Sequence, residues 1–280
     1  MIFWICTTSV VFIIAGVIFY KPYLGVALII VSIPFEGIID LGHFSIYPLE
    51  TILAILVLVC IYKSVLGRDN CFRSTKLMYC CIPFVLCIML SAVKSIELSL
   101  TVKEIVRWLE LFVIYYITIN LINDDKKMRV ILYSIFLTMA MVSVFGIINF
   151  WSIGYWLGRA VSFFGNPNPL AGYANLIIPV SFGMLMTSVC LWERITLGIF
   201  AVLSIIIWIL TFSRSAWFSL ILTMILVFSL TKVKKKRAVL ALVVFLAISV
   251  IAILLLPSNI NIKGRFMETT TLNAAKVSLE

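Results

Sequence analysis

Long apolar runs constrain this chain more than any other feature of its sequence. Ten segments read as candidate membrane spans, and several reach about 18 residues, the length that a helix needs to cross the ~30 Å hydrocarbon core of a bilayer. Hydrophobic residues make up 63% of the 280 positions and charged residues 12%, whereas soluble domains are about half apolar and a quarter charged. The pattern predicts an all-α, polytopic transmembrane bundle of about ten spans: 2–20, 23–39, 47–63, 77–94, 106–122, 128–150, 169–190, 195–211, 215–230 and 238–256.

The charged connections between these spans predict an orientation. The chain carries a net charge of +10, and its densest basic cluster, "KVKKKR" at 232–237, is expected in the cytoplasm because basic loops are retained there. Alternation of the spans then places 151–168 and 212–214 on the outer face, with the N-terminus outside as well. If one of the first two spans is absent, only the N-terminus changes side. Three other basic-rich connections fall in the cytoplasm: 67–76, 123–129 and 193–195.

The chain reads as one membrane domain over residues 1–256, followed by a polar tail at 257–280 that looks like the start of an external loop. Its charge is explained by the loops, so we expect no nucleic-acid partner. The seven cysteines lie mostly in apolar runs without metal-ligand spacing, and we interpret them as packing residues. No metal and no cofactor are expected.

Charged residues near the spans are informative, because they are costly in a membrane and usually face a cavity or a partner. In "KEIVRWLE" (103–110), Glu104, Arg107 and Glu110 are spaced three apart and share one helix face. They form either an ion-pair ladder that supports helix packing or a charged wall of an outer cavity.

A second polar interruption is "LTFSRSAW" at 210–217, where Ser213 and Arg214 separate two spans on the predicted outer face. A single outward arginine opposes the tendency of basic residues to stay inside. Arg214 either extends to outer lipid head groups or binds an anion, since the guanidinium donates two parallel hydrogen bonds to phosphate oxygens.

The third interruption is "SFFGNPNPLAGY" at 162–173, which follows the outward Arg159. Asn168 before Pro169 suits a helix N-cap followed by proline at the first helical position. That role leaves the preceding Asn166 and Pro167 unexplained. A helix N-terminus here also presents free N–H groups to an anion, and spacing alone leaves capping and binding both open. Two weaker candidates are Arg265 in the tail and His43, which we expect to be a solvated loop residue.

Taken together, "FFGNPNPLAGYANLIIP" (163–179) and "LTFSRSAW" resemble the O-antigen ligase and O-antigen polymerase superfamily of bacterial envelope glycan assembly. The resemblance covers about 160 to 265, and residues 1–150 match in hydropathy only. The matching positions are Gly165, Asn168, Leu170, Ala171, Pro179, Ser213 and Arg214.

The resemblance implies a fold similar to that of multi-span lipid-dependent glycosyltransferases. It also implies metal-independent glycosyl transfer at the outer face of the bacterial cytoplasmic membrane. The donor would be a glycan on undecaprenyl diphosphate, and the acceptor would be a growing glycan or lipid A-core. Arg214 would be the catalytic contact to the diphosphate. Beside this contact, we predict that the diphosphate or the glycan is bound by Arg159, Asn166, Asn168, Ser213 and Arg265.

The sequence departs from the family pattern at its end. In the family, further arginines and a histidine or other base lie in a long external loop, which closing spans follow. This sequence stops at Glu280, so we expect a fragment of a longer reading frame. Two other functions stay open, namely a transporter or flippase of a lipid-linked or anionic solute, and an inactive truncated remnant. No internal repeat of the kind that many transporters show is evident.

Overall fold

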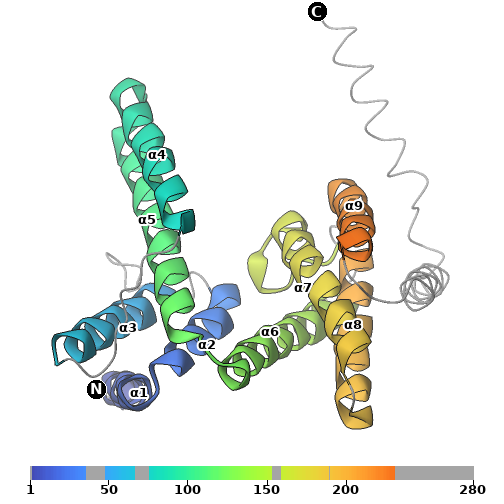
Figure 1. Cartoon of the computed structure of the whole chain (residues 1–280). Coiled ribbons are helices and arrows are strands. Elements are labelled where there is room, and N and C mark those ends of the chain that lie inside the picture. The colour runs from blue at the N-terminus through green and yellow to red at the C-terminus, as the bar shows by residue number, and fades with distance from the viewer. Residues whose placement is uncertain (1, 36–47, 67–75, 153–158, 189, 231–280) are drawn as a thin grey trace, which may run out of the picture. The chain divides into compact units, whose positions relative to one another are not determined.

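The computed structural model describes residues 2–35, 48–66, 76–152, 159–188 and 190–230. These residues form helices and turns without a strand, so the all-helical prediction is confirmed for this part of the chain (Figure 1). In chain order the elements are α1 (Ile2–Tyr20), α2 (Pro22–Ser32), η1 (Ile33–Phe35), α3 (Pro48–Val65), α4 (Lys76–Ser91), η2 (Ala92–Lys94), α5 (Leu98–Leu121), α6 (Asp125–Ser152), η3 (Ser162–Phe164), α7 (Pro167–Thr187), α8 (Leu191–Leu210) and α9 (Arg214–Leu230).

Four of these helices are long and apolar enough to cross a membrane: α3, α6, α7 and α8. The described apolar parts of α1, α2 with η1, α4 with η2, and α9 are shorter. Helix α5 has 24 residues, but the charged residues between 103 and 110 interrupt its apolar surface. The expected span at 238–256 lies outside the described residues. The structure therefore supports a helical membrane protein and gives four candidate spans among the described residues.

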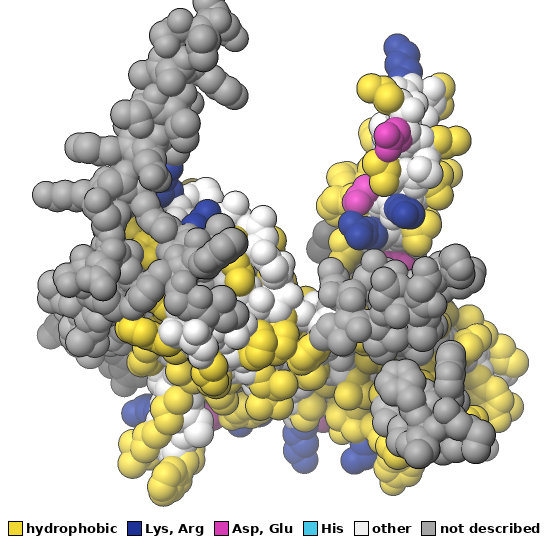
Figure 2. All heavy atoms as spheres, turned by 180° about the vertical axis from the view of Figure 1, so that it is seen from behind, with side chains coloured by type: hydrophobic (Ala, Val, Ile, Leu, Met, Phe, Trp, Pro, Cys, Tyr) yellow, Lys and Arg dark blue, Asp and Glu magenta, His cyan; other side chains and the backbone are white. Residues whose placement is uncertain are grey.

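The exposed surface of the helices is also apolar. On the face shown in Figure 2, hydrophobic side chains cover much of the described helices. Phe12, Leu58, Leu176 and Phe218 are 77%, 67%, 72% and 78% exposed. Burying apolar surface stabilises a soluble protein by about 25 cal/mol per Å², and a soluble chain would not leave so many large side chains in water. Lipid tails would solvate this surface, which agrees with a membrane protein.

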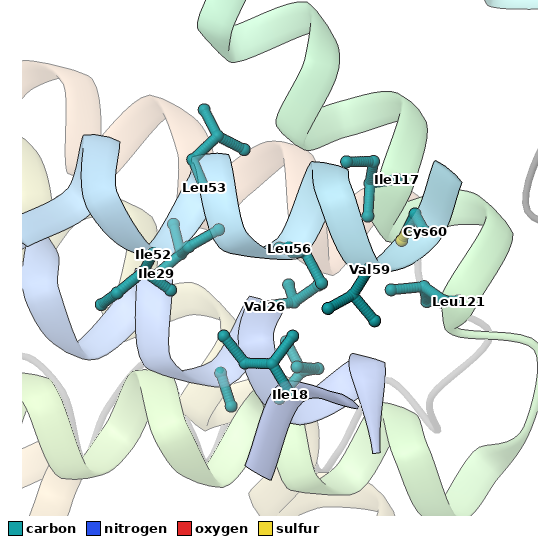
Figure 3. Packing of buried hydrophobic residues seen from close by; sticks show 12 residues of the cluster. Ile18, Val26, Ile29, Ile52, Leu53, Leu56, Val59, Cys60, Ile117 and Leu121 are labelled. Carbon is teal, nitrogen blue, oxygen red and sulfur yellow. The ribbon is translucent and has the colours of Figure 1, made fainter. Parts of the chain in front are cut away.

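The chain divides into two compact units, residues 1–138 and 139–280. In the first unit, α1, α2, α3 and α5 enclose a cluster of buried apolar side chains (Figure 3). Leu56 lies fully buried in this cluster, which also contains Ile18 and Val26. A β-carbon at Gly25 would come within 2.8 Å of Leu56 Cδ1, so glycine allows α2 and α3 to approach each other closely.

Helices α4 and α5 pair through aromatic contacts within the same unit. The ring of Phe84 on α4 packs edge-on against Trp108 and Phe112 of α5, at centroid distances of 5.0 and 5.9 Å. Pro83 lies inside α4, where it cannot donate the backbone hydrogen bond of a regular helix.

In the second unit, α7 packs against both α8 and α9, as Figure 1 shows. The second half of α6 also touches the turn before α7, since the Phe145 and Phe163 rings stack at 4.0 Å. A β-carbon at Gly146 would lie 2.7 Å from Ile207 Cδ1 and 3.1 Å from Ser162 Cβ. Glycine at this position therefore permits the close approach of α6, α8 and η3.

Basic side chains cap two helix C-termini in the connections that the sequence assigns to the cytoplasm. Lys127 Nζ donates to Leu121 O at 3.3 Å, where α5 ends. Arg194 Nε donates to Ser188 O at 2.9 Å, just after α7. Cations at these positions satisfy free carbonyl groups and the negative end of the helix dipole.

Candidate functional site

The candidate site is built around the N-terminus of α7. Gly165 adopts a left-handed φ of +61°, which glycine tolerates without a steric penalty, and this turn separates η3 from α7. Asn166 is the N-cap, and its Oδ1 accepts from the backbone N–H of Asn168 at 2.9 Å. Pro167 follows as the first helical residue. The prediction of Asn168 as the cap is wrong by two residues, because the turn at Gly165 starts the helix at the first Asn-Pro pair.

This shift leaves the Asn168 side chain free to make tertiary contacts. Its Oδ1 accepts from Arg159 Nη2 at 3.0 Å and from Ser213 Oγ at 3.2 Å. Asn168 thus joins a residue before α7 to the turn between α8 and α9. The two sequence motifs, 162–173 and 210–217, meet through this side chain.

Arg159 makes a second contact at the same end of the unit. Its Nε donates to Thr211 O at 2.7 Å, and the neighbouring Ala160 N–H donates to Leu210 O at 2.8 Å. Both carbonyls lie at the C-terminus of α8, where backbone acceptors have no partner within the helix. Arg159 therefore has a structural role, as the cation that closes α8.

The turn between α8 and α9 is short and largely buried. Thr211 is fully buried, and its Oγ1 donates to Trp208 O at 2.6 Å. Phe212 has a φ of +48°, a conformation that bulky residues rarely adopt. Ser213 is 3% exposed, whereas the next residue, Arg214, is exposed at the start of α9.

The charge that the described residues place at this end of the unit is positive. Between residues 139 and 230 the only acidic residue is Glu193, which lies in the first turn of α8. A helix of 20 residues separates it from the turn at Ser213 by about 30 Å. Arg159 and Arg214 therefore lie at an end of the unit without a carboxylate from this part of the chain, and the field there favours an anion.

Sequence reasoning missed one further polar contact, on the adjoining turns of α7 and α9. Asn175 Nδ2 donates to Ala216 O at 3.0 Å and also contacts Ser219 Oγ. Asn175 Oδ1 is buried without a partner among the described residues. An asparagine inside an apolar span could have signalled this contact, because such amides usually bond across helices in membranes.

The remaining predicted residues lie elsewhere. On α5, in the first unit, Arg107 Nη1 and Glu104 Oε1 pair at 2.9 Å, with both side chains more than half exposed. Glu110 is half-buried one turn further on. Arg265 and His43 lie outside the described residues. Within the described part of the chain, no group of three or more His, Cys, Asp or Glu residues is placed to hold a metal ion.

No family model, no curated protein and no solved structure matches the chain.

Proposed function

We propose that this chain is a multi-pass protein of the bacterial cytoplasmic membrane, with about ten spans. It binds glycans linked to undecaprenyl diphosphate at the outer face and takes part in their polymerisation or ligation. The observation that supports this most directly is the hydrogen-bonded contact of Arg159, Asn168 and Ser213. This contact joins two polar interruptions of an apolar chain beside the exposed Arg214.

The arginines near the two ends of α8 support our assignment of one end to the cytoplasmic side of the membrane and the other to its outer side. Arg194 lies in its first turn and bonds the end of α7, while Arg214 follows its last turn. The length of α8, about 30 Å at 1.5 Å per residue, matches the hydrocarbon thickness of a bilayer. With the basic connections in the cytoplasm, Arg214 reaches the outer interface, where lipid-linked glycans are assembled.

The chemistry of glycosyl transfer suits an arginine at this place. A hydroxyl oxygen of the acceptor bonds to the anomeric carbon of the donor, and the bond from that carbon to the diphosphate oxygen breaks. The diphosphate leaves with the electron pair and gains negative charge. A guanidinium at the edge of a low-dielectric membrane stabilises that charge through two parallel hydrogen bonds. Arg214 is the residue that we assign to this contact.

The proton of the acceptor hydroxyl passes to a general base. Between residues 139 and 230 the sequence contains no histidine, and its one carboxylate, Glu193, lies at the opposite end of α8. We therefore assign the base to a residue outside this range.

A transfer assay tests the proposal. The full-length protein is reconstituted in liposomes with an undecaprenyl-diphosphate-linked oligosaccharide, with or without lipid A-core, and the products are separated on a gel. We expect longer glycans or glycan-bearing lipid A-core with the wild type, and none with Arg214→Ala at equal membrane insertion. Undiminished product from Arg214→Ala, or no product from the wild type, would overturn the proposal.

A further inference from the structure

We infer that Asn168 is a positioning residue, which fixes the turn that carries Arg214 and does not itself bind the ligand through its oxygen. This inference rests on the proposed anion site at Arg214. It replaces a direct binding role for Asn168 with an indirect one, and the hydrogen bonds of the side chain are the reason.

The acceptor capacity of Asn168 is used within the protein. An amide oxygen has two lone pairs, and here one faces Arg159 Nη2 at 3.0 Å and the other Ser213 Oγ at 3.2 Å. The backbone N–H of Asn168 is bonded to Asn166 Oδ1, so it is not available to an anion either.

The contact to Ser213 is the one that reaches Arg214. Ser213 is almost fully buried and directly precedes the exposed Arg214. Its hydroxyl also lies 3.3 Å from Ser215 Oγ. Without Asn168, the Ser213 hydroxyl keeps only its contact with the exposed Ser215, and the turn loses this hydrogen bond to the start of α7.

The hydrogen bond between Asn168 and Ser213 matters less for the folding of the chain than for the position of the turn. Asn168 is exposed, and Arg159 retains its bond to Thr211 O when Asn168 is removed. The junction of α8 with the segment before α7 also keeps the backbone bond from Ala160 to Leu210. Asn168→Ala should therefore give a folded protein in which Arg214 is less well placed.

A spin label at position 214 tests positioning without a ligand. In the full chain with its other cysteines replaced, Arg214→Cys is labelled and its electron paramagnetic resonance spectrum is recorded. We expect a broad, immobilised line shape, which narrows with Asn168→Ala and stays broad with Asn168→Asp. Aspartate keeps the accepting oxygen that bonds Arg159 and Ser213. Identical spectra for Asn168→Ala and its parent would overturn the inference.

Binding of undecaprenyl diphosphate in nanodiscs supplies the second test. Asn168→Ala should weaken the Kd about tenfold, the equivalent of one hydrogen bond to a charged network, with an unchanged number of binding sites. In the Arg214→Ala background, the same substitution should have no further effect. Asn120→Ala is the matched control, since this asparagine lies on α5 in the first unit, where its Nδ2 donates to Tyr116 O at 2.8 Å.

The outcomes of the two tests separate the claims. If the wild type binds the lipid and Asn168→Ala binds it equally well, the positioning role is wrong while the proposed function stands. If the effects of Asn168→Ala and Arg214→Ala multiply, Asn168 acts independently of Arg214, which also contradicts the inference. If the wild type does not bind the lipid, the proposed function fails, and the line shapes alone decide whether Asn168 orders the turn.

Discussion

The two units of this chain are held together by different kinds of contact. The first unit has a continuous apolar cluster around Leu56 (Figure 3), and the hydrogen bonds from Lys127 to Leu121 O and from Asn120 to Tyr116 O join residues six and four positions apart. In the second unit, side-chain hydrogen bonds span 52 residues between Arg159 and Thr211, and 45 between Ser213 and Asn168.

This difference indicates which part of the chain is the better candidate for a functional site. Apolar side chains pack α1, α2, α3 and α5 of the first unit together, and polar bonds between residues a few positions apart add little to tertiary structure. Long-range polar bonds between helix ends are costly to arrange, because each group gives up water or lipid head groups and is held in one geometry. The bonds among Arg159, Asn168, Ser213 and Thr211 therefore mark this end of the second unit as a place where side-chain position matters.

Leu56→Ala should give the largest loss of stability and should leave ligand affinity unchanged. Leu56 is fully buried in the first unit, and removing a buried leucine side chain costs about 2–5 kcal/mol through lost contacts and the cavity left behind. Thermal unfolding of the detergent-solubilised protein measures the loss, and the Kd for undecaprenyl diphosphate at low temperature measures the affinity. Weaker binding by a fully folded Leu56→Ala protein would contradict the assignment of ligand binding to the second unit alone.

Gly146→Val should reduce both stability and affinity. The added side chain would crowd the buried Ile207 and Ser162, and overpacking costs about 1–3 kcal/mol. Displacement of η3 would also disturb the segment that carries Arg159 and the start of α7. Gly25→Val, which crowds Leu56 in the first unit, should lower stability alone.

Gly183→Val is the control for this pair, because a β-carbon at Gly183 meets nothing within 4 Å. The same unfolding and binding measurements apply to all three variants. Equal effects of Gly25→Val and Gly146→Val on the Kd would contradict the assignment of the site to the second unit.

Glu104→Gln should have the smallest effect. Its pair with Arg107 lies within α5, and the two side chains are 57% and 66% exposed. Exposed ion pairs contribute less than about 1 kcal/mol, so the unfolding temperature and the Kd should both remain close to those of the wild type. A large change in the Kd would show that the first unit contributes charge to the site.

Much of the helical architecture could be predicted from the sequence. The expected spans 47–63, 128–150, 169–190 and 195–211 coincide with the four helices that are long and apolar enough to cross a membrane. Hydropathy is a local property and predicts helices directly. It does not predict how they pack, since close approaches such as that of Gly146 to Ile207 depend on residues far apart in the sequence.

The candidate site could be predicted in part. Arg159, Asn168, Ser213 and Arg214 stand out as polar residues at the ends of apolar runs, but their partners could not be read from spacing. The choice between Asn166 and Asn168 as the cap is ambiguous in sequence, because a proline follows each of them. The bond from Arg159 to Thr211 O involves a backbone carbonyl, and no sequence pattern identifies a backbone acceptor.

The central claim is that Arg214, at the outer end of the second unit, binds a lipid-linked diphosphate. The most direct measurement is the Kd for undecaprenyl diphosphate in nanodiscs, compared between Arg214→Ala and Arg194→Ala. Arg194 is the matched control, an exposed arginine near the opposite end of α8. We predict that Arg194→Ala binds like the wild type, while Arg214→Ala binds at least about tenfold more weakly, the loss of a charge-assisted hydrogen bond. Equal binding by both variants would contradict the account.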